Sequence, residues 1–99
     1  MNNNQGITKI KFTKTIYPFC PLGGDFYRAE IEVTIFPNDE LFDFCEIEKQ
    51  IEKLSMESLI IEDVADAVYK IMLEYNPKDI KIVVNGYSNK HFPVEVTKE

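Results

Sequence analysis

Residues that bind metals or form disulfides are scarce in this sequence of 99 residues. The chain has one histidine, His91, and two cysteines, Cys20 and Cys45, which form no Cys-x-x-Cys pair. A zinc site built on histidine needs partner residues that the chain does not have, which argues against the zinc enzymes. The two cysteines are expected to be free, reduced thiols of a cytoplasmic protein.

Long apolar runs and an excess of basic residues are also absent. No apolar run approaches the length of a membrane span, and no basic segment followed by an apolar one opens the chain, so we expect neither a membrane protein nor a signal peptide. The chain has 11 Lys and Arg residues against 17 Asp and Glu residues, a net charge of −6. This balance argues against a protein that follows nucleic-acid phosphates, because such a protein needs a basic face.

The residues that are present suit one small folded domain. Hydrophobic residues make up 44% of the chain and include five Tyr and seven Phe, which favours a packed core over disorder. Without repeats, linkers or low-complexity segments, residues 1–99 are expected to form a single domain, with residues 1–6 frayed. A domain of this size buries a modest share of its surface, so a homo-oligomer is expected.

Alternation of apolar and polar residues predicts four strands. The pattern extends from Ile7 to Ile16, from Phe26 to Phe36, from Ile80 to Val84 and from Phe92 to Val96. The turn-rich segment from Asn85 to Asn89 is expected to connect the last two strands. A proline in the fourth segment predicts that this strand lies at a sheet edge.

Between the two strand pairs, the spacing of apolar residues predicts two helices. The first begins at Asp43, which can cap it, and the second extends from about Ile61 to Glu74. The resulting order is strand, strand, helix, helix, strand, strand. It predicts an α+β fold in which two helices cover one face of a four-stranded antiparallel sheet.

The loop from Phe19 to Phe26 is the candidate functional segment. Cys20 precedes a proline, two glycines follow, and Asp25 leads into the second strand. Proline restricts the residue before it and glycine permits unusual backbone angles, so the loop is expected to turn sharply and to bring Cys20 and Asp25 together. A thiol beside a carboxylate suits nucleophilic chemistry with a proton donor at hand. The alternative is that Cys20 is a buried structural residue and Asp25 a turn residue.

A series of short motifs extends over nearly the whole chain. It comprises a Cys-Pro pair, a Gly pair, an Asp-Phe pair, an alternating strand ending at a proline, an acidic residue near a helix start and an Asn-Pro pair: Cys20-Pro21, Gly23-Gly24, Asp25-Phe26, Ala29 to Pro37, Glu62 and Asn76-Pro77. In order and spacing, this series resembles the QueF family of the tunnelling-fold superfamily. Members of that superfamily bind purine- or pterin-like rings between subunits, and the QueF family acts on 7-cyano-7-deazaguanine.

The resemblance implies a role for each residue of the site. Cys20 would attack the nitrile carbon and form a covalent thioimide, and Asp25 would supply or relay the proton. Glu62 would accept hydrogen bonds from the ring, although an acidic residue also suits a helix N-terminus without any ligand. Phe19 and Phe26 would wall the ring pocket, with core packing as the alternative. The site would lie between subunits of a homo-oligomer.

Departures from the family pattern bear on the reaction. The reductases of the family have a histidine where this chain has Ile61, and a Ser-Lys-Ser motif where it has Asp43 to Glu46. These departures favour the shorter branch, which needs no cofactor and adds ammonia to the thioimide to form an amidine, as in archaeosine formation in tRNA. The alternatives are an NADPH-dependent reductase, as in queuosine formation, and a non-catalytic purine- or pterin-binding or assembly protein. The substrate would be a free 7-deazapurine or one carried in tRNA.

Overall fold

The computed structural model describes residues 6–99, and the expectation of a frayed N-terminus therefore falls almost wholly outside the described residues. The predicted order of two strands, two helices and two strands is confirmed, with a small extra hairpin after the first strand. The elements are β1 (Ile10–Ile16), β2 (Phe19–Cys20), β3 (Asp25–Phe26), β4 (Arg28–Phe36), α1 (Phe44–Lys53), the 3-10 turn η1 (Leu54–Met56), α2 (Ile61–Leu73), β5 (Asp79–Ser88) and β6 (His91–Lys98).

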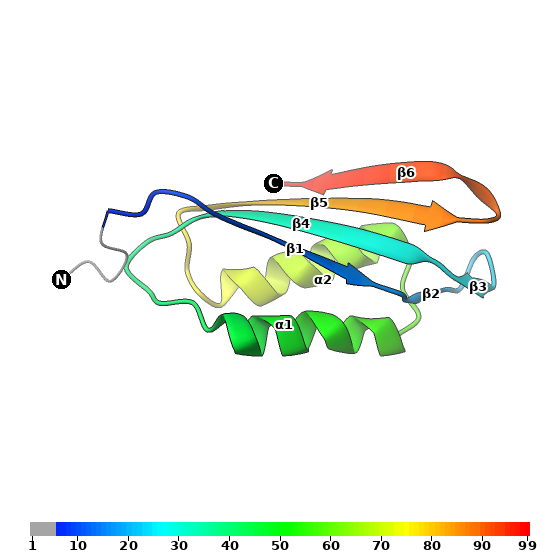
Figure 1. Ribbon diagram of the computed structural model, residues 1–99, viewed down its shortest axis with the longest axis horizontal. Helices are drawn as coiled ribbons and strands as arrows, with labels where there is room; N and C mark the ends of the chain where they lie inside the picture. Colours follow the sequence, from blue (N-terminus) through cyan, green and yellow to red (C-terminus); the bar gives the residue numbers. More distant parts are fainter. Residues whose placement is uncertain (1–5) are drawn as a thin grey trace.

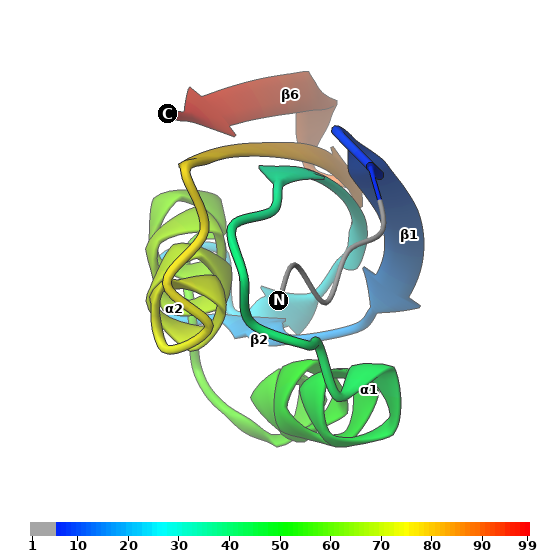
Figure 2. The same cartoon turned by 90° about the vertical axis from the view of Figure 1, so that its left-hand side faces the viewer.

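The main sheet has four antiparallel strands in the order β1-β4-β5-β6. Both helices cover the same face of this sheet, as the side view and the end view show together (Figures 1 and 2). The predicted α+β architecture is confirmed, and the proline-containing strand β6 lies at an edge as expected. None of the helices in the described part of the chain is long and apolar enough to cross a membrane.

The core lies between the sheet and the helices. Alternate residues of β4 and β5 point toward the helices and are buried, whereas their neighbours on the outer face are largely charged or polar. The period of two along a strand and the apolar stripe along each helix bring these side chains together. The buried residues are Ala29, Ile31, Val33 and Ile35 of β4, Ile80, Ile82 and Val84 of β5, Ile47 and Ile51 of α1, and Val64, Ala65, Val68 and Met72 of α2.

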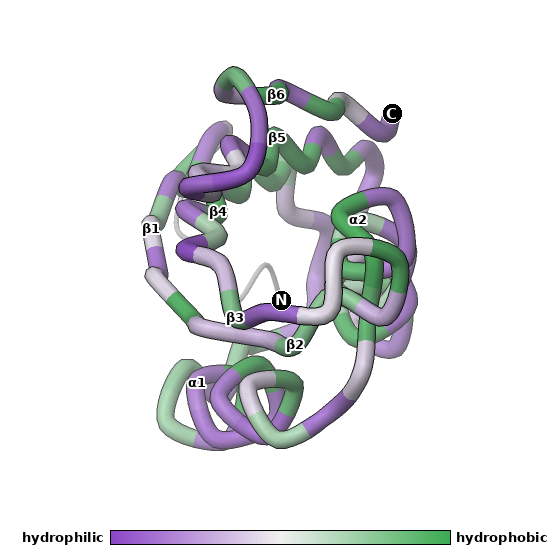
Figure 3. Tube along the Cα trace, turned by 90° about the vertical axis from the view of Figure 1, so that its right-hand side faces the viewer, coloured by the Kyte–Doolittle hydropathy of each residue, from purple (hydrophilic) through white to green (hydrophobic). Residues whose placement is uncertain are grey.

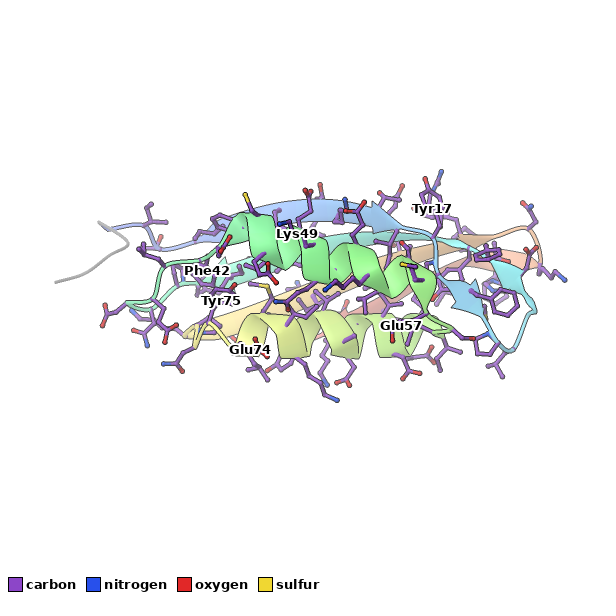
Figure 4. All side chains as sticks on the ribbon, turned by 90° about the horizontal axis from the view of Figure 1, so that it is seen from below. Tyr17, Phe42, Lys49, Glu57, Glu74 and Tyr75 are labelled. Carbon is purple, nitrogen blue, oxygen red and sulfur yellow. The ribbon has the colours of Figure 1, made fainter. Side chains whose placement is uncertain are left out.

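The two helices are fixed at their outer ends by a cap and by an aromatic pair. The carboxylate of Asp43 accepts a hydrogen bond of 3.0 Å from the backbone N–H of Glu46, which confirms the predicted cap of α1. Phe42, just before α1, stacks on Tyr75, just after α2, with 5.4 Å between the ring centroids. Figure 4 shows this pair at the end of the helices opposite Glu57. At the other end of the helix pair, Glu57 and Leu59 form backbone hydrogen bonds with Phe19 of β2.

The last hairpin is longer than predicted. β5 continues to Ser88, β6 already begins at His91, and the segment from Asn85 to Asn89 is therefore mostly strand rather than a connection. The polar residues of this segment mimic a turn, but β4 and β6 pair with it on both sides, so the ladder of hydrogen bonds holds it extended. Only two residues form the turn, and the backbone N–H of Lys90 donates to Ser88 Oγ at 3.1 Å.

Candidate active site

A cavity of about 410 Å³ lies at one end of the molecule. Three segments that are distant in sequence meet there, namely the β2–β3 loop, the start of α2 and the β5–β6 turn (Figures 1 and 3). Cys20, Asp25 and Glu62, the three residues predicted to carry the chemistry, all line this cavity. Its volume is within the range of about 300–1,000 Å³ that is usual for small-molecule sites.

Cys20 and Asp25 are held opposite each other by the β2–β3 hairpin, in which they are direct partners. Opposed residues of an antiparallel pair have their Cβ atoms about 4.5–5.5 Å apart, so the thiol and the carboxylate are neighbours. The turn is closed by a 2.8 Å hydrogen bond from the Gly24 N–H to the Cys20 carbonyl, and Gly24 has a φ of +71°, an angle that favours glycine. Asp25 Oδ1 accepts a 2.8 Å bond from the Phe26 N–H, which orients the carboxylate.

Backbone hydrogen bonds fix this hairpin to the segment that leads into α2. The Phe19 N–H donates to the Glu57 carbonyl at 3.2 Å, and the Leu59 N–H donates to the Phe19 carbonyl at 2.8 Å. The Tyr27 hydroxyl adds a third bond, donating to the Leu59 carbonyl at 2.7 Å. Since Glu62 follows within one turn, these bonds determine where its carboxylate lies relative to Cys20.

The cavity is lined by the buried side chain of Tyr27 and by the exposed carboxylate of Glu62. Burial raises the pKa of the Tyr27 hydroxyl, and the neighbouring Cys20, Glu62 and Asp63 raise it further. The hydroxyl therefore remains protonated and keeps its bond to the backbone. Glu62 is exposed in the first turn of α2, where the helix dipole favours a negative charge.

The two predicted aromatic residues of the site lie beside the loop. Phe19 and Phe26 pack edge to face across the β2–β3 hairpin, with 5.3 Å between the ring centroids. Neither is among the residues that line the cavity, and Phe26 instead borders a neighbouring depression together with Tyr17 and Tyr87. Their position stabilises the hairpin that carries Cys20 and Asp25.

The third wall of the cavity was not predicted from the sequence. Ser88, Lys90 and His91, around the β5–β6 turn, face the same space as the Cys20 loop. His91 is exposed in this wall. No motif in the local sequence marks these residues, because only the sheet order brings them to the loop.

The floor of the cavity depends on Gly86 of β5. A Cβ atom at this buried position would lie 2.7 Å from Ile61 Cδ1, much closer than carbon atoms pack. The absence of a side chain at Gly86 therefore lets the first turn of α2 lie directly against β5. Within residues 6–99, no group of three or more His, Cys, Asp or Glu side chains is arranged to hold a metal ion.

Comparison with known proteins establishes the fold. No family model matches the sequence, and no curated protein matches it. The structure is similar to the crystal structure of the archaeosine synthase QueF-Like in the apo form, with a TM-score of 0.83 and 20% sequence identity over 94% of this chain and 93% of that chain. The chain has the tunnelling fold. The fold predicted from the order of the elements and from the resemblance is thereby confirmed.

Proposed function

We propose that this protein is a QueF-like enzyme that acts on the nitrile of 7-cyano-7-deazaguanine, free or carried in tRNA, through a thioimide at Cys20. The observation that supports this most strongly is the convergence of Cys20, Asp25 and Glu62 on one cavity. Their order around it suits a ring whose polar edge faces α2 and whose nitrile faces the β2–β3 hairpin. The similarity in fold to an archaeosine synthase supports the same class of substrate.

Ring binding is assigned to Glu62. Its carboxylate accepts hydrogen bonds from a ring N–H and an exocyclic amino group, a pairing that places two donors against two acceptor oxygens. The start of α2 favours the ionised form that this pairing needs. The apolar side chain of Ile61 and the floor at Gly86 then face the ring itself.

The covalent step joins the Cys20 sulfur to the nitrile carbon. As the S–C bond forms, one π bond of the nitrile breaks, the thiol proton passes to the Asp25 carboxylate, and Asp25 delivers this proton to the nitrile nitrogen. Ammonia then attacks the thioimide carbon, the S–C bond breaks, and the product leaves as an amidine while the thiol is restored. This sequence requires a nucleophile and proton transfer but no nicotinamide cofactor.

The test is the intact mass of the protein after incubation with 7-cyano-7-deazaguanine. The wild type should gain the mass of one ligand, and Cys20→Ala should gain none. Cys45→Ala is the matched control, because Cys45 is an exposed cysteine on α1 outside the cavity, and this variant should gain the ligand. No mass gain in the wild type would contradict the proposal. If the adduct forms, release of an amidine with ammonia supports the amidine-forming reaction, whereas oxidation of NADPH would identify a reductase.

A further inference from the structure

A second depression, of about 450 Å³, adjoins the candidate active site and has no part in the steps described so far. Tyr27 and Ser88 line both this depression and the cavity of Cys20, so the two hollows meet at these residues. The other residues that line the second depression are Tyr17, Phe26, Arg28, Tyr87 and Asn89. Three of these five are aromatic, against 12% of the whole chain, so an aromatic surface lies directly beside the space assigned to the deazapurine ring.

Two of the aromatic rings are open to a ligand. Tyr17 is 57% exposed and Phe26 is 63% exposed. Figure 4 shows Tyr17 projecting outward at the end of β1. Phe26 packs edge to face on Phe19, so the β2–β3 hairpin holds this ring in place without covering it. Exposed apolar surface that is held on a paired backbone is typical of binding sites, and a flat ring suits another planar group.

Arg28 gives the second depression a fixed cation. Arg28 and Tyr87 are partners across β4 and β5, and the guanidinium Cζ lies 4.4 Å from the centroid of the Tyr87 ring. Arg28 Nε also lies 3.4 Å from the Glu30 carboxylate, so the guanidinium is held by two neighbours. A guanidinium has five N–H donors in one plane, and those that do not face Glu30 can bind a phosphate.

Exposed rings beside a fixed guanidinium suit single-stranded RNA as a ligand. Proteins that recognise such RNA stack its unpaired bases on aromatic side chains and on Arg planes. Stacking uses the face of a base and needs no broad basic surface, so the net charge of −6 does not oppose it. A free 7-deazapurine ring would occupy the cavity of Cys20 alone, whereas a ring carried in RNA brings neighbouring nucleotides with it.

We infer that the second depression binds the nucleotide next to the 7-cyano-7-deazaguanine of a single-stranded RNA substrate. This inference rests on the proposed function, and it selects the RNA-borne form of the substrate. The neighbouring base stacks on the exposed rings of Tyr17 and Phe26, and Arg28 donates hydrogen bonds to the phosphate that joins the two nucleotides. The RNA backbone passes from one hollow to the other beside Tyr27 and Ser88.

The experiment measures binding by calorimetry on a Cys20→Ala background, with two probes. One probe is the free 7-cyano-7-deazaguanine base, and the other is a short single-stranded RNA that carries this base between two ordinary nucleotides. Loss of one stacking contact weakens binding about 5- to 150-fold, so Tyr17→Ala and Tyr87→Ala should lose this factor for the RNA and nothing for the free base. Tyr87→Phe keeps the ring and should keep the affinity. Phe92→Ala is the matched control, because Phe92 is 76% exposed and lines neither hollow.

The dependence of RNA affinity on salt tests the phosphate contact of Arg28. Each phosphate contact of a single strand contributes about 0.7 to the slope of log affinity against log salt concentration. Arg28→Gln should therefore lower this slope by about 0.7 for the RNA and leave the affinity for the free base unchanged. An unchanged slope would overturn the phosphate contact.

The outcomes distinguish the inference from the proposed function. Unchanged RNA affinity in both tyrosine variants, or an equal loss for the two probes, overturns the inference and leaves the proposed function intact. Tyr17→Ala lies at an exposed site outside the core, so it decides the matter if Tyr87→Ala does not fold. If these variants instead dissociate an oligomer that the wild type forms in size-exclusion chromatography, a second copy of the chain covers the depression and the inference is overturned. A wild type that forms no adduct with either probe overturns the proposed function itself.

Discussion

The substitution Gly86→Ala, which adds one carbon atom, tests how closely β5 and α2 pack beneath the cavity. A Cβ atom there would lie 2.7 Å from Ile61 Cδ1 and 3.6 Å from Ile61 Cγ1. Carbon atoms pack at about 3.5–4.0 Å, so Cδ1 must move by about 1 Å while Cγ1 can remain in ordinary contact. Both residues line the cavity, and the displaced end of Ile61 has the cavity as its free space. Gly86→Ala should therefore affect both stability and ring binding.

The expected change in stability is the sum of two opposing effects. Extra atoms in a packed site cost about 1–3 kcal/mol, and the cost here should lie near the lower end because the terminal methyl group of Ile61 can move into the cavity. Replacing glycine by alanine also stabilises the protein by about 0.4–1 kcal/mol, because the unfolded chain has less conformational freedom to lose. The net loss of stability for Gly86→Ala is then at most about 0.6 kcal/mol. Under the proposed function, affinity for 7-cyano-7-deazaguanine should fall as well, because the Ile61 methyl group enters the space assigned to the ring.

Ile61→Val provides the matched variant, because it removes Cδ1 and keeps Cγ1. In the double variant the steric conflict is absent, so the coupling energy between the two substitutions should equal the overpacking cost of about 1 kcal/mol. Urea unfolding of the four proteins measures this coupling, and calorimetry on a Cys20→Ala background measures ring affinity without adduct formation. If the two substitutions add to within about 0.5 kcal/mol, Ile61 does not meet the new Cβ and the reasoning is refuted.

Two further predictions concern Tyr27 and Asp66. Tyr27→Phe removes the 2.7 Å bond to the Leu59 carbonyl and should cost about 1–3 kcal/mol in urea unfolding, as for a buried polar group left unpaired; a loss below 0.5 kcal/mol would show that the bond is replaced. Hydrogen bonds from Lys70 and Lys98 lower the pKa of the exposed Asp66 carboxylate, so its contribution to stability is present at neutral pH and is lost as the pH falls through its folded-state pKa. The difference in Tm between Asp66→Asn and the wild type should therefore be largest near pH 7 and shrink as the pH falls through the folded-state pKa of Asp66, and a constant difference would contradict this.

The fold was predictable where one local rule acted alone. β4 alternates cleanly because one face packs on the helices, and Asp43 caps α1 through its own side chain. The local sequence gave a wrong prediction at the end of β5, because Asn85 and Gly86 are residue types that are common in turns. Two neighbouring strands pair with this segment, and Gly86 is required for the close approach of Ile61 rather than for a turn. Tertiary pairing therefore overrode local preference.

Two of the three walls of the site were predictable, and the third was not. The chemistry of the loop indicated that Cys20 and Asp25 would be close, because a short hairpin determines the distance between them. His91 is far from this loop in sequence, and its position depends on the strand order β4-β5-β6 and on a turn of only two residues. Neither feature leaves a local pattern around His91. Contacts of this kind follow from topology, which sequence periodicity does not specify.

The residues proposed to carry the chemistry are different from the residues that stabilise the site. Asp25 and Glu62 are exposed side chains on a backbone that is already paired or helical, so their replacement leaves the core untouched. Gly86 and Tyr27 are buried, and they connect the cavity to the packing of α2 on the sheet. The exposed side chains around the cavity can therefore be replaced without changing the buried contacts of Gly86 and Tyr27 beneath it. This is consistent with a fold retained at 20% identity, because the backbone bonds that hold the three segments together do not depend on which side chains enter the cavity.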